Sequence, residues 1–241
     1  MNRLAYLLLP VLLLTETLGS ANYEVRYKLG MLDTRVVTAE ITWEESSWNG
    51  IPAYYSAAVI ETTPFFRLFL ASNYFAETYF SQDELKPLYF DNPFQHKGKD
   101  GMIEYVFRQD TGEIESTTTL GDKTEFQTFP NDGQTVDFLS LVHYIRFLDL
   151  SCMEEPLPMH ILISGKSYPA ELIYLGEDLE KHPGIPSDKF LLQLTEHGLM
   201  ENKSGNEVYI WRSCGADRNI IALETDLSTG TMYARLSSVK D

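Results

Sequence analysis

Positively charged residues are scarce in this 241-residue sequence. Its 19 Lys and Arg residues face 35 Asp and Glu residues, which gives a formal net charge of −16 at pH 7. Because nucleic-acid binding depends on Lys and Arg side chains that neutralise phosphates, we do not expect a nucleic-acid partner. The same deficit argues against attraction to anionic lipid headgroups by charge alone. Such an acidic balance is typical of a soluble protein whose copies repel one another.

Only two cysteines occur, Cys152 and Cys214. They are too far apart for the Cys-x-x-Cys spacing of redox enzymes, so we do not expect a catalytic disulfide. Two alternatives remain: in an oxidising compartment they would form one structural disulfide, and otherwise they would be two buried thiols. We predict the Cys152–Cys214 disulfide.

Long hydrophobic runs are also absent. The longest covers Leu4–Leu14, whereas a transmembrane helix needs about 20 residues. Arg3 precedes this run and small residues at 19–21 follow it, which is the order of a cleavable signal peptide. We therefore predict a signal peptide at 1–21, no stable membrane span after its cleavage, and a single β-rich domain at 22–241.

Recognisable catalytic and metal-binding motifs are missing as well. The five histidines form no His-x-His or His-Glu-x-x-His pair, and the Gly-x-Ser-x-Gly motif of esterases does not occur. The run SGKS at 164–167 resembles the end of a phosphate-binding loop, but His160 stands where that loop needs its first glycine. Strand-like residues rather than a helix follow, so we predict a hairpin turn there. The sequence thus predicts no metal site, no cofactor and no catalytic residue.

The sequence does contain a succession of short β-rich runs separated by turn residues. The stretch DGMIEYVFRQDTGEIESTTT is typical of a hairpin, because apolar Ile103, Tyr105 and Phe107 alternate with other side chains. A second hairpin is expected around the STG turn at 228–230. About ten to twelve such runs at close spacing favour an antiparallel sheet curved into a β-roll or a partly open barrel.

One stretch, TVDFLSLVHYIRFLDLS, departs from this β pattern. Its apolar residues recur at helical spacing and Asp137 stands at an N-cap position, so we predict a helix at about 136–150. The helix is apolar on nearly every side and is interrupted mainly by Ser140, His143 and Arg146. Such a helix is buried or spans a membrane, and this one is too short to span. The predicted fold class is therefore mainly β, an antiparallel curved sheet with one buried helix.

Four stretches of the chain match a family pattern in both residues and order. They are YEVRYKLGMLDTRVVTAEITW at 23–43, NYFAETYFSQDELKPLYF at 73–90, VDFLSLVHYIR at 136–146 and VYIWRSCGADRNIIALETDLSTGTMYARL at 208–236. Matching positions in the second and third are Tyr79, Leu85, Pro87, Phe90, Asp137, Leu139, Ser140, Tyr144 and Arg146. Through these stretches the chain resembles the bacterial exported cell-envelope proteins classified as a domain of unknown function, DUF3108.

The resemblance implies a location in the periplasm or the outer cell envelope. It also implies an antiparallel β-roll or partly open barrel. It implies no reaction, because none is established for the family. The sequence departs from the family at Cys214 and Gly215, where relatives have an acidic pair, so no role of such a pair is expected here.

Two groups of residues are candidates for ligand binding. Aromatic residues are concentrated between residues 65 and 80, where they either pack in the core or line an apolar cavity inside the curved sheet. The polar side chains of the helix are either satisfied by the sheet or form a site in which His143 and Arg146 would share an anion. The candidate ligand-binding residues are Phe66, Phe69, Phe75, Tyr79, Ser140, His143, Tyr144 and Arg146.

These observations favour an exported, non-catalytic binding module of the envelope. Its ligand would be an apolar molecule, such as a lipid or a hydrophobic peptide, or its partner would be another envelope protein. Two alternatives remain. One is an envelope hydrolase in which Ser140 and His143 act as nucleophile and base. The other is a purely structural or adhesion protein.

Overall fold

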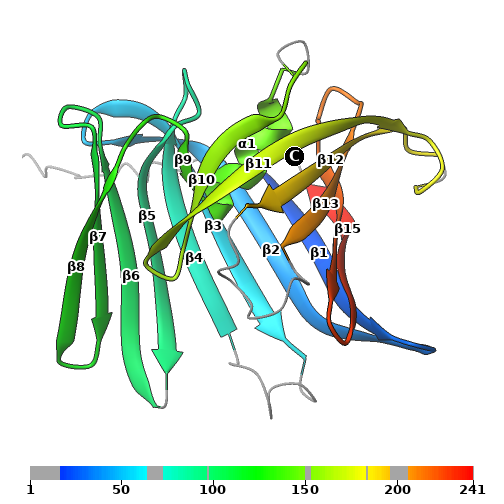
Figure 1. Cartoon of the computed structure of the whole chain (residues 1–241), viewed down its shortest axis with the longest axis horizontal. Helices are drawn as coiled ribbons and strands as arrows, with labels where there is room; N and C mark the ends of the chain where they lie inside the picture. The colour runs from blue at the N-terminus through cyan, green and yellow to red at the C-terminus, as the bar shows by residue number, and fades with distance from the viewer. Residues whose placement is uncertain are drawn as a thin grey trace, which may run out of the picture.

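The computed structural model of the chain describes residues 17–63, 73–96, 98–149, 153–182, 184–195 and 206–240. Within these ranges the protein consists of one 15-stranded sheet and one helix, α1 (Phe138–Phe147). Neighbouring strands are antiparallel, except that β9 (Thr135–Asp137) and β10 (Leu157–Ile163) are parallel. The expectation of a mainly β fold with a single helix is confirmed (Figure 1).

The strands form two arms, and within each arm every strand pairs with the next one along the chain. The N-terminal arm contains β1 (Thr17–Leu29), β2 (Leu32–Trp48), β3 (Ile51–Thr62), β4 (Asn73–Ser81), β5 (Pro87–His96), β6 (Lys99–Arg108), β7 (Glu113–Leu120) and β8 (Lys123–Pro130). The C-terminal arm contains β9, β10, β11 (Lys166–Asp178), β12 (Ser187–Leu194), β13 (Glu207–Ser213), β14 (Ile220–Leu227) and β15 (Gly230–Lys240). The arms join where β1 pairs with β15.

Tight turns keep consecutive strands paired. Asn49 and Gly50 join β2 to β3 with φ angles of 50° and 83°, and Ser164 and Gly165 join β10 to β11 with 51° and 76°. Two residues with positive φ form the turn whose twist matches that of an antiparallel hairpin. The hairpin turn expected in the SGKS run is therefore confirmed, and the phosphate-loop alternative is excluded.

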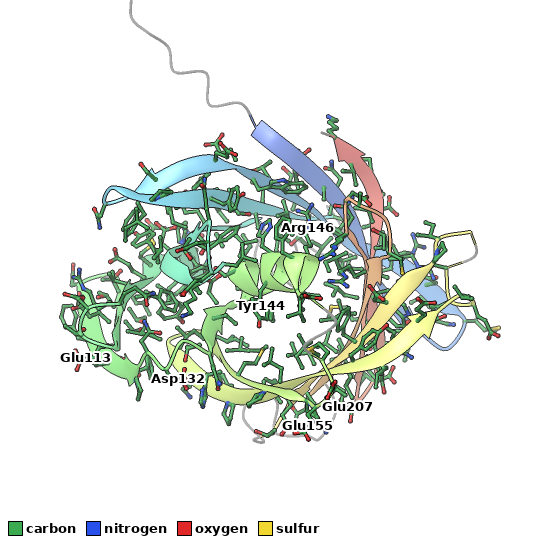
Figure 2. All side chains as sticks on the ribbon, turned by 90° about the horizontal axis from the view of Figure 1, so that it is seen from above. Glu113, Asp132, Tyr144, Arg146, Glu155 and Glu207 are labelled. Atoms are coloured by element: carbon green, nitrogen blue, oxygen red, sulfur yellow. The ribbon has the colours of Figure 1, made fainter. Side chains whose placement is uncertain are left out.

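The sheet curls into a ring that surrounds α1 (Figure 2). Its two edges are β8 and β9, which follow each other in the sequence but are not paired in the strand order. Side chains bridge this seam, since the Gly165 amide donates a 2.8 Å hydrogen bond to the Tyr105 hydroxyl oxygen. Leu162 of β10 also packs among buried residues of the N-terminal arm. The curved, partly open barrel expected from the sequence is confirmed.

The helix is shorter than the predicted 136–150. Residues 135–137 form β9 instead, because they pair with β10, and Leu148 leaves the helical conformation with φ −55° and ψ 129°. Asp137 caps the N-terminus, as expected from the sequence. The prediction that the helix is buried on nearly every side holds only in part. Phe147 is 44% exposed, whereas several polar side chains of the helix are buried.

The predicted cleavage site after Ala21 lies inside β1, while residues 1–16 lie outside the described residues. Ala21 is buried and packs with Trp43. Removal of residues 1–21 would therefore shorten β1 but leave its paired residues from Asn22 onward. In the described part of the chain, no helix combines the length and the apolarity needed to cross a membrane.

Candidate functional site

The polar residues of α1 predicted as candidates lie on its buried side. The exposed fractions of Ser140, His143 and Arg146 are 0%, 1% and 7%. Their spacing of three residues places them along one helix face, which packs toward β3 and β4. Tyr144, by contrast, is half-buried and lies on the side of α1 opposite to Arg146 (Figure 2).

Asp137 anchors the start of the helix to the N-terminal arm. Its Oδ1 accepts hydrogen bonds from the Leu139 amide (2.9 Å) and the Ser140 amide (2.8 Å), and its Oδ2 accepts one from Ser140 Oγ (2.6 Å). Thr78 Oγ1 on β4 lies 3.1 Å from the same Oδ2. Burial raises the pKa of Asp137, although these hydrogen bonds oppose the increase. The Ser140 hydroxyl is therefore committed to the helix cap.

His143 is hydrogen-bonded to the sheet. Ser56 Oγ donates to the Thr42 carbonyl oxygen (2.8 Å), so it accepts from the Nε2–H of His143 (2.8 Å), which assigns a neutral tautomer. The imidazole stacks on Phe80 with 4.9 Å between ring centroids and meets Trp43 edge-on. Burial and the Arg146 charge lower the pKa of His143 to about 3. The residue thus stays neutral and out of contact with water.

Arg146 completes this face of the helix. Its guanidinium carbon lies 4.1 Å from the centroid of the Trp43 ring, and Nη2 donates to the Asp217 carbonyl oxygen at 3.4 Å. Ser140, His143 and Arg146 therefore contact different parts of the sheet. They do not form the nucleophile-and-base arrangement that a hydrolase would need.

The end of the helix is held by Arg212 of β13, a residue that no sequence motif indicated. Its Nη1 donates to the carbonyl oxygens of Ile145 (2.9 Å) and Leu148 (2.8 Å). Its Nε and Nη2 donate to Asp188 Oδ2 at 3.2 and 2.7 Å. Arg212 and Asp188 are only 2% and 5% exposed, so the ion pair is buried. Nothing in the linear pattern relates these residues to the helix, because 64 or more positions separate Arg212 from the carbonyls it binds.

A cavity of about 190 Å³ lies between α1 and the sheet at the junction of the two arms. Among the described residues that line it, every side chain except that of Tyr23 is a hydrocarbon, and Tyr23 turns only ring carbons to the cavity. The lining residues come from α1, β1, β2, β3, β14 and β15: Phe138, Leu139, Val142, Tyr23, Val25, Ala39, Ile41, Ala58, Ile60, Ile220, Leu223 and Ala234. Three of them are alanines on different strands, and these small side chains leave the space unfilled.

Two of the aromatic residues predicted to line such a cavity, Phe75 and Tyr79, do not do so. Phe75 and Tyr79 alternate along β4 with Thr78 and Phe80, which contact the helix, so they point to the other face of the sheet. There Tyr79 packs against Trp48 with 4.9 Å between ring centroids. The density of aromatics indicated a cluster, but it did not reveal which strand face turned inward.

Three other predicted residues remain without a structural test. Phe66 and Phe69 lie outside the described residues. Cys152 does as well, whereas Cys214 is exposed. The Cys152–Cys214 disulfide therefore stays a prediction. Within the described ranges, no group of His, Cys, Asp and Glu side chains could hold a metal ion.

Comparisons with known proteins place the fold and the family. A β-barrel-like protein of the domain of unknown function DUF1849 from Brucella abortus is similar in structure, with a TM-score of 0.59 and 8% sequence identity. The likeness covers 92% of this chain and 96% of that chain, and it shows the fold alone. A comparison with curated proteins gives no match. The family described as "Protein of unknown function (DUF3108)" matches residues 22–237, and the chain belongs to this family.

Proposed function

We propose that this protein is exported to the cell envelope and binds an apolar ligand in the cavity beside α1, without catalysing a reaction. The observation that carries the proposal is the hydrocarbon lining of a 190 Å³ cavity inside the curved sheet. An engineered apolar cavity of about 150 Å³ stays dry and binds benzene, so a space of this size and lining suits a small apolar group.

The walls of the cavity are held in place from both ends of α1. Asp137 and Thr78 fix its start to β4, and Arg212 fixes its end to β13. A preformed site loses less conformational entropy on binding than one that must order itself. The fixed position of α1 therefore supports a role for the cavity as a preformed binding site.

The hydrolase alternative is not favoured. Ser140 Oγ donates to Asp137, and His143 is 1% exposed with its Nε2 bound to Ser56. A nucleophile and a base must reach each other, the substrate and water, and neither side chain does. No observation specifically supports a purely structural role.

The binding proposal is tested by titrating a fluorescent fatty acid into purified protein, with mass spectrometry of organic extracts for co-purified lipid. Ala58→Phe inserts a ring into the cavity from β3 and is expected to abolish uptake while the fold is kept, because the existing cavity gives the ring space. Val59→Leu is the matched control, since Val59 is 41% exposed on the opposite face of the same strand. Absence of both co-purified lipid and probe uptake by the unmodified protein would contradict the proposal.

Export is tested separately by cell fractionation and N-terminal sequencing. We expect a periplasmic or outer-envelope protein that begins at Asn22. A chain recovered from the envelope that still begins at Met1 would contradict cleavage, and recovery only from the cytoplasm would contradict export.

A further inference from the structure

The edge strand β8 is largely exposed beside the part of the ring that is closed. The C-terminal arm closes against β5 and β6, since the Gly165 amide bonds to Tyr105 of β6 and Leu162 packs in one cluster with Phe90 of β5. β8 lies at the far left of Figure 1, away from α1. Its side chains are exposed on both faces, apart from the half-buried Phe129. Among the described residues, no strand pairs with its free edge.

This free edge presents the backbone groups of three residues. β7 and β8 are joined by a two-residue turn between Leu120 and Lys123, so these two residues form a hydrogen-bonded pair. Hydrogen-bonded and non-hydrogen-bonded pairs alternate along an antiparallel ladder. The amide and carbonyl groups of Thr124, Phe126 and Thr128 therefore point away from β7, toward the open edge.

An open edge of this kind can add a strand from another chain. At its middle stands Phe126, a large apolar residue that is 76% exposed. β8 contains one lysine and one glutamate, so its own net charge is zero, whereas the whole chain carries −16. A second copy of this acidic chain would therefore meet little local repulsion at β8.

We propose that β8 pairs antiparallel with β8 of a second copy, about a two-fold axis at Phe126. In this register Thr124 faces Thr128 of the second copy, and the two Phe126 side chains are directly opposite each other. Each open amide and carbonyl group then faces an open group of the other copy. Aromatic pairs and Thr–Thr pairs across a ladder add to the stability of the contact.

Charge and symmetry limit this assembly to two copies. Glu125 lies opposite Gln127 of the second copy in the proposed register, so no two carboxylates meet across the ladder. The other edge of the sheet, β9, is buried along its whole length and is not open to a third copy. The pairing is thus a closed two-fold dimer. It uses no residue of the cavity beside α1 and does not depend on the proposed function.

The register is tested with a cysteine at the axis. Phe126→Cys places two thiols in a hydrogen-bonded pair, where the Cα atoms lie about 5.5 Å apart, a separation that a disulfide spans. Under mild oxidation we expect a covalent dimer whose linked peptides, identified by mass spectrometry, both contain residue 126. Glu125→Cys is the matched control, because its two copies would be diagonal neighbours about 7–8 Å apart, too far for a bridge. No link through residue 126, or an equal link through residue 125, would overturn the register.

The strength of the pairing is measured by sedimentation velocity over a concentration series. We expect a reversible monomer–dimer equilibrium that tightens as NaCl is raised, because salt screens the repulsion between two chains of charge −16. Phe126→Glu removes the aromatic pair and sets two carboxylates opposite each other, so it should weaken dimerisation about tenfold. Met31→Glu is the matched control, since Met31 is 104% exposed in the turn between β1 and β2 and the change adds the same charge. It should dimerise like the unmodified protein.

Three outcomes would overturn the proposal. The first is an unmodified chain that stays monomeric at every concentration of protein and salt. The second is an equal effect of the two glutamate substitutions, because net charge and not β8 would then control the association. The third is a β8 edge that pairs with a strand of a different protein while the chain does not associate with itself.

Discussion

Replacement of Arg212 tests most directly how the helix is held inside the ring. Arg212→Met removes the charge and the donors but keeps an unbranched apolar stem. It leaves Asp188 as a buried carboxylate without its cation and deprives the carbonyls of Ile145 and Leu148 of their donor. Breaking a buried ion pair on one side costs about 3–5 kcal/mol. That is a large part of the roughly 5–15 kcal/mol by which a folded protein is stable.

We therefore expect the free energy of unfolding of Arg212→Met to fall by about 3–5 kcal/mol. At about 2–4 °C per kcal/mol for a chain of this size, Tm should fall by roughly 6–20 °C. Urea unfolding followed by tryptophan fluorescence provides the measurement, since Trp43 packs on Arg146 and Trp211 neighbours the substituted residue.

The matched control is Arg108→Met, which breaks an ion pair with Glu115 whose side chains are 46% and 51% exposed. An exposed pair of this kind contributes at most about 1 kcal/mol. Adding Asp188→Asn to Arg212→Met should restore part of the lost stability, because the unpaired charge is then removed. A loss below about 1 kcal/mol for Arg212→Met would refute the reasoning, as the buried pair would then behave like a surface one.

Two further predictions concern pH and redox state. Burial, followed by the neighbouring charge of Glu77, raises the pKa of Asp91 to about 6, so the folded state binds this proton more tightly than the unfolded state. The stability it contributes is complete below about pH 4 and is lost as the pH rises through about 6, so Tm should fall from pH 5 to pH 7.5. Asp91→Asn should reduce this fall, and an unchanged profile would show that other groups cause it. For the disulfide, protein exported and alkylated without reduction should carry no label on Cys152 or Cys214, and reduction should cost up to about 4 kcal/mol of stability. Labelling of both cysteines before reduction would disprove the bridge.

Local sequence signals were reliable where local contacts decide the structure. The Asp137 cap depends on amides two and three residues away, and the turn at Ser164 and Gly165 depends on two backbone conformations. Both were predictable, as was the antiparallel sheet that alternation and turn residues indicate. The extent of the helix was not, because its ends are set by distant partners, β10 at one end and Arg212 at the other.

The candidate site was less predictable than the fold. Alternation along β4 identifies two sets of side chains but does not tell which set faces inward, so Phe75 and Tyr79 were expected on the wrong face. The cavity itself arises where five strands from both arms meet the helix. No stretch of sequence contains that junction, and the residues around it become neighbours only when β1 pairs with β15.

The pairing of β1 with β15 has a consequence for how the chain folds. Tyr23 lies opposite Leu236, so the central contact of the sheet joins segments separated by almost the entire polypeptide. Such a high contact order implies slow folding, on the order of milliseconds to seconds or longer. During synthesis or translocation, each arm can assemble as a meander on its own, but the first strand keeps one open edge until the last strand emerges. If synthesis or translocation stopped before β15 emerged, β1 would keep an unpaired edge. This edge lies at the middle of the final strand order, and it could pair with another chain and start aggregation.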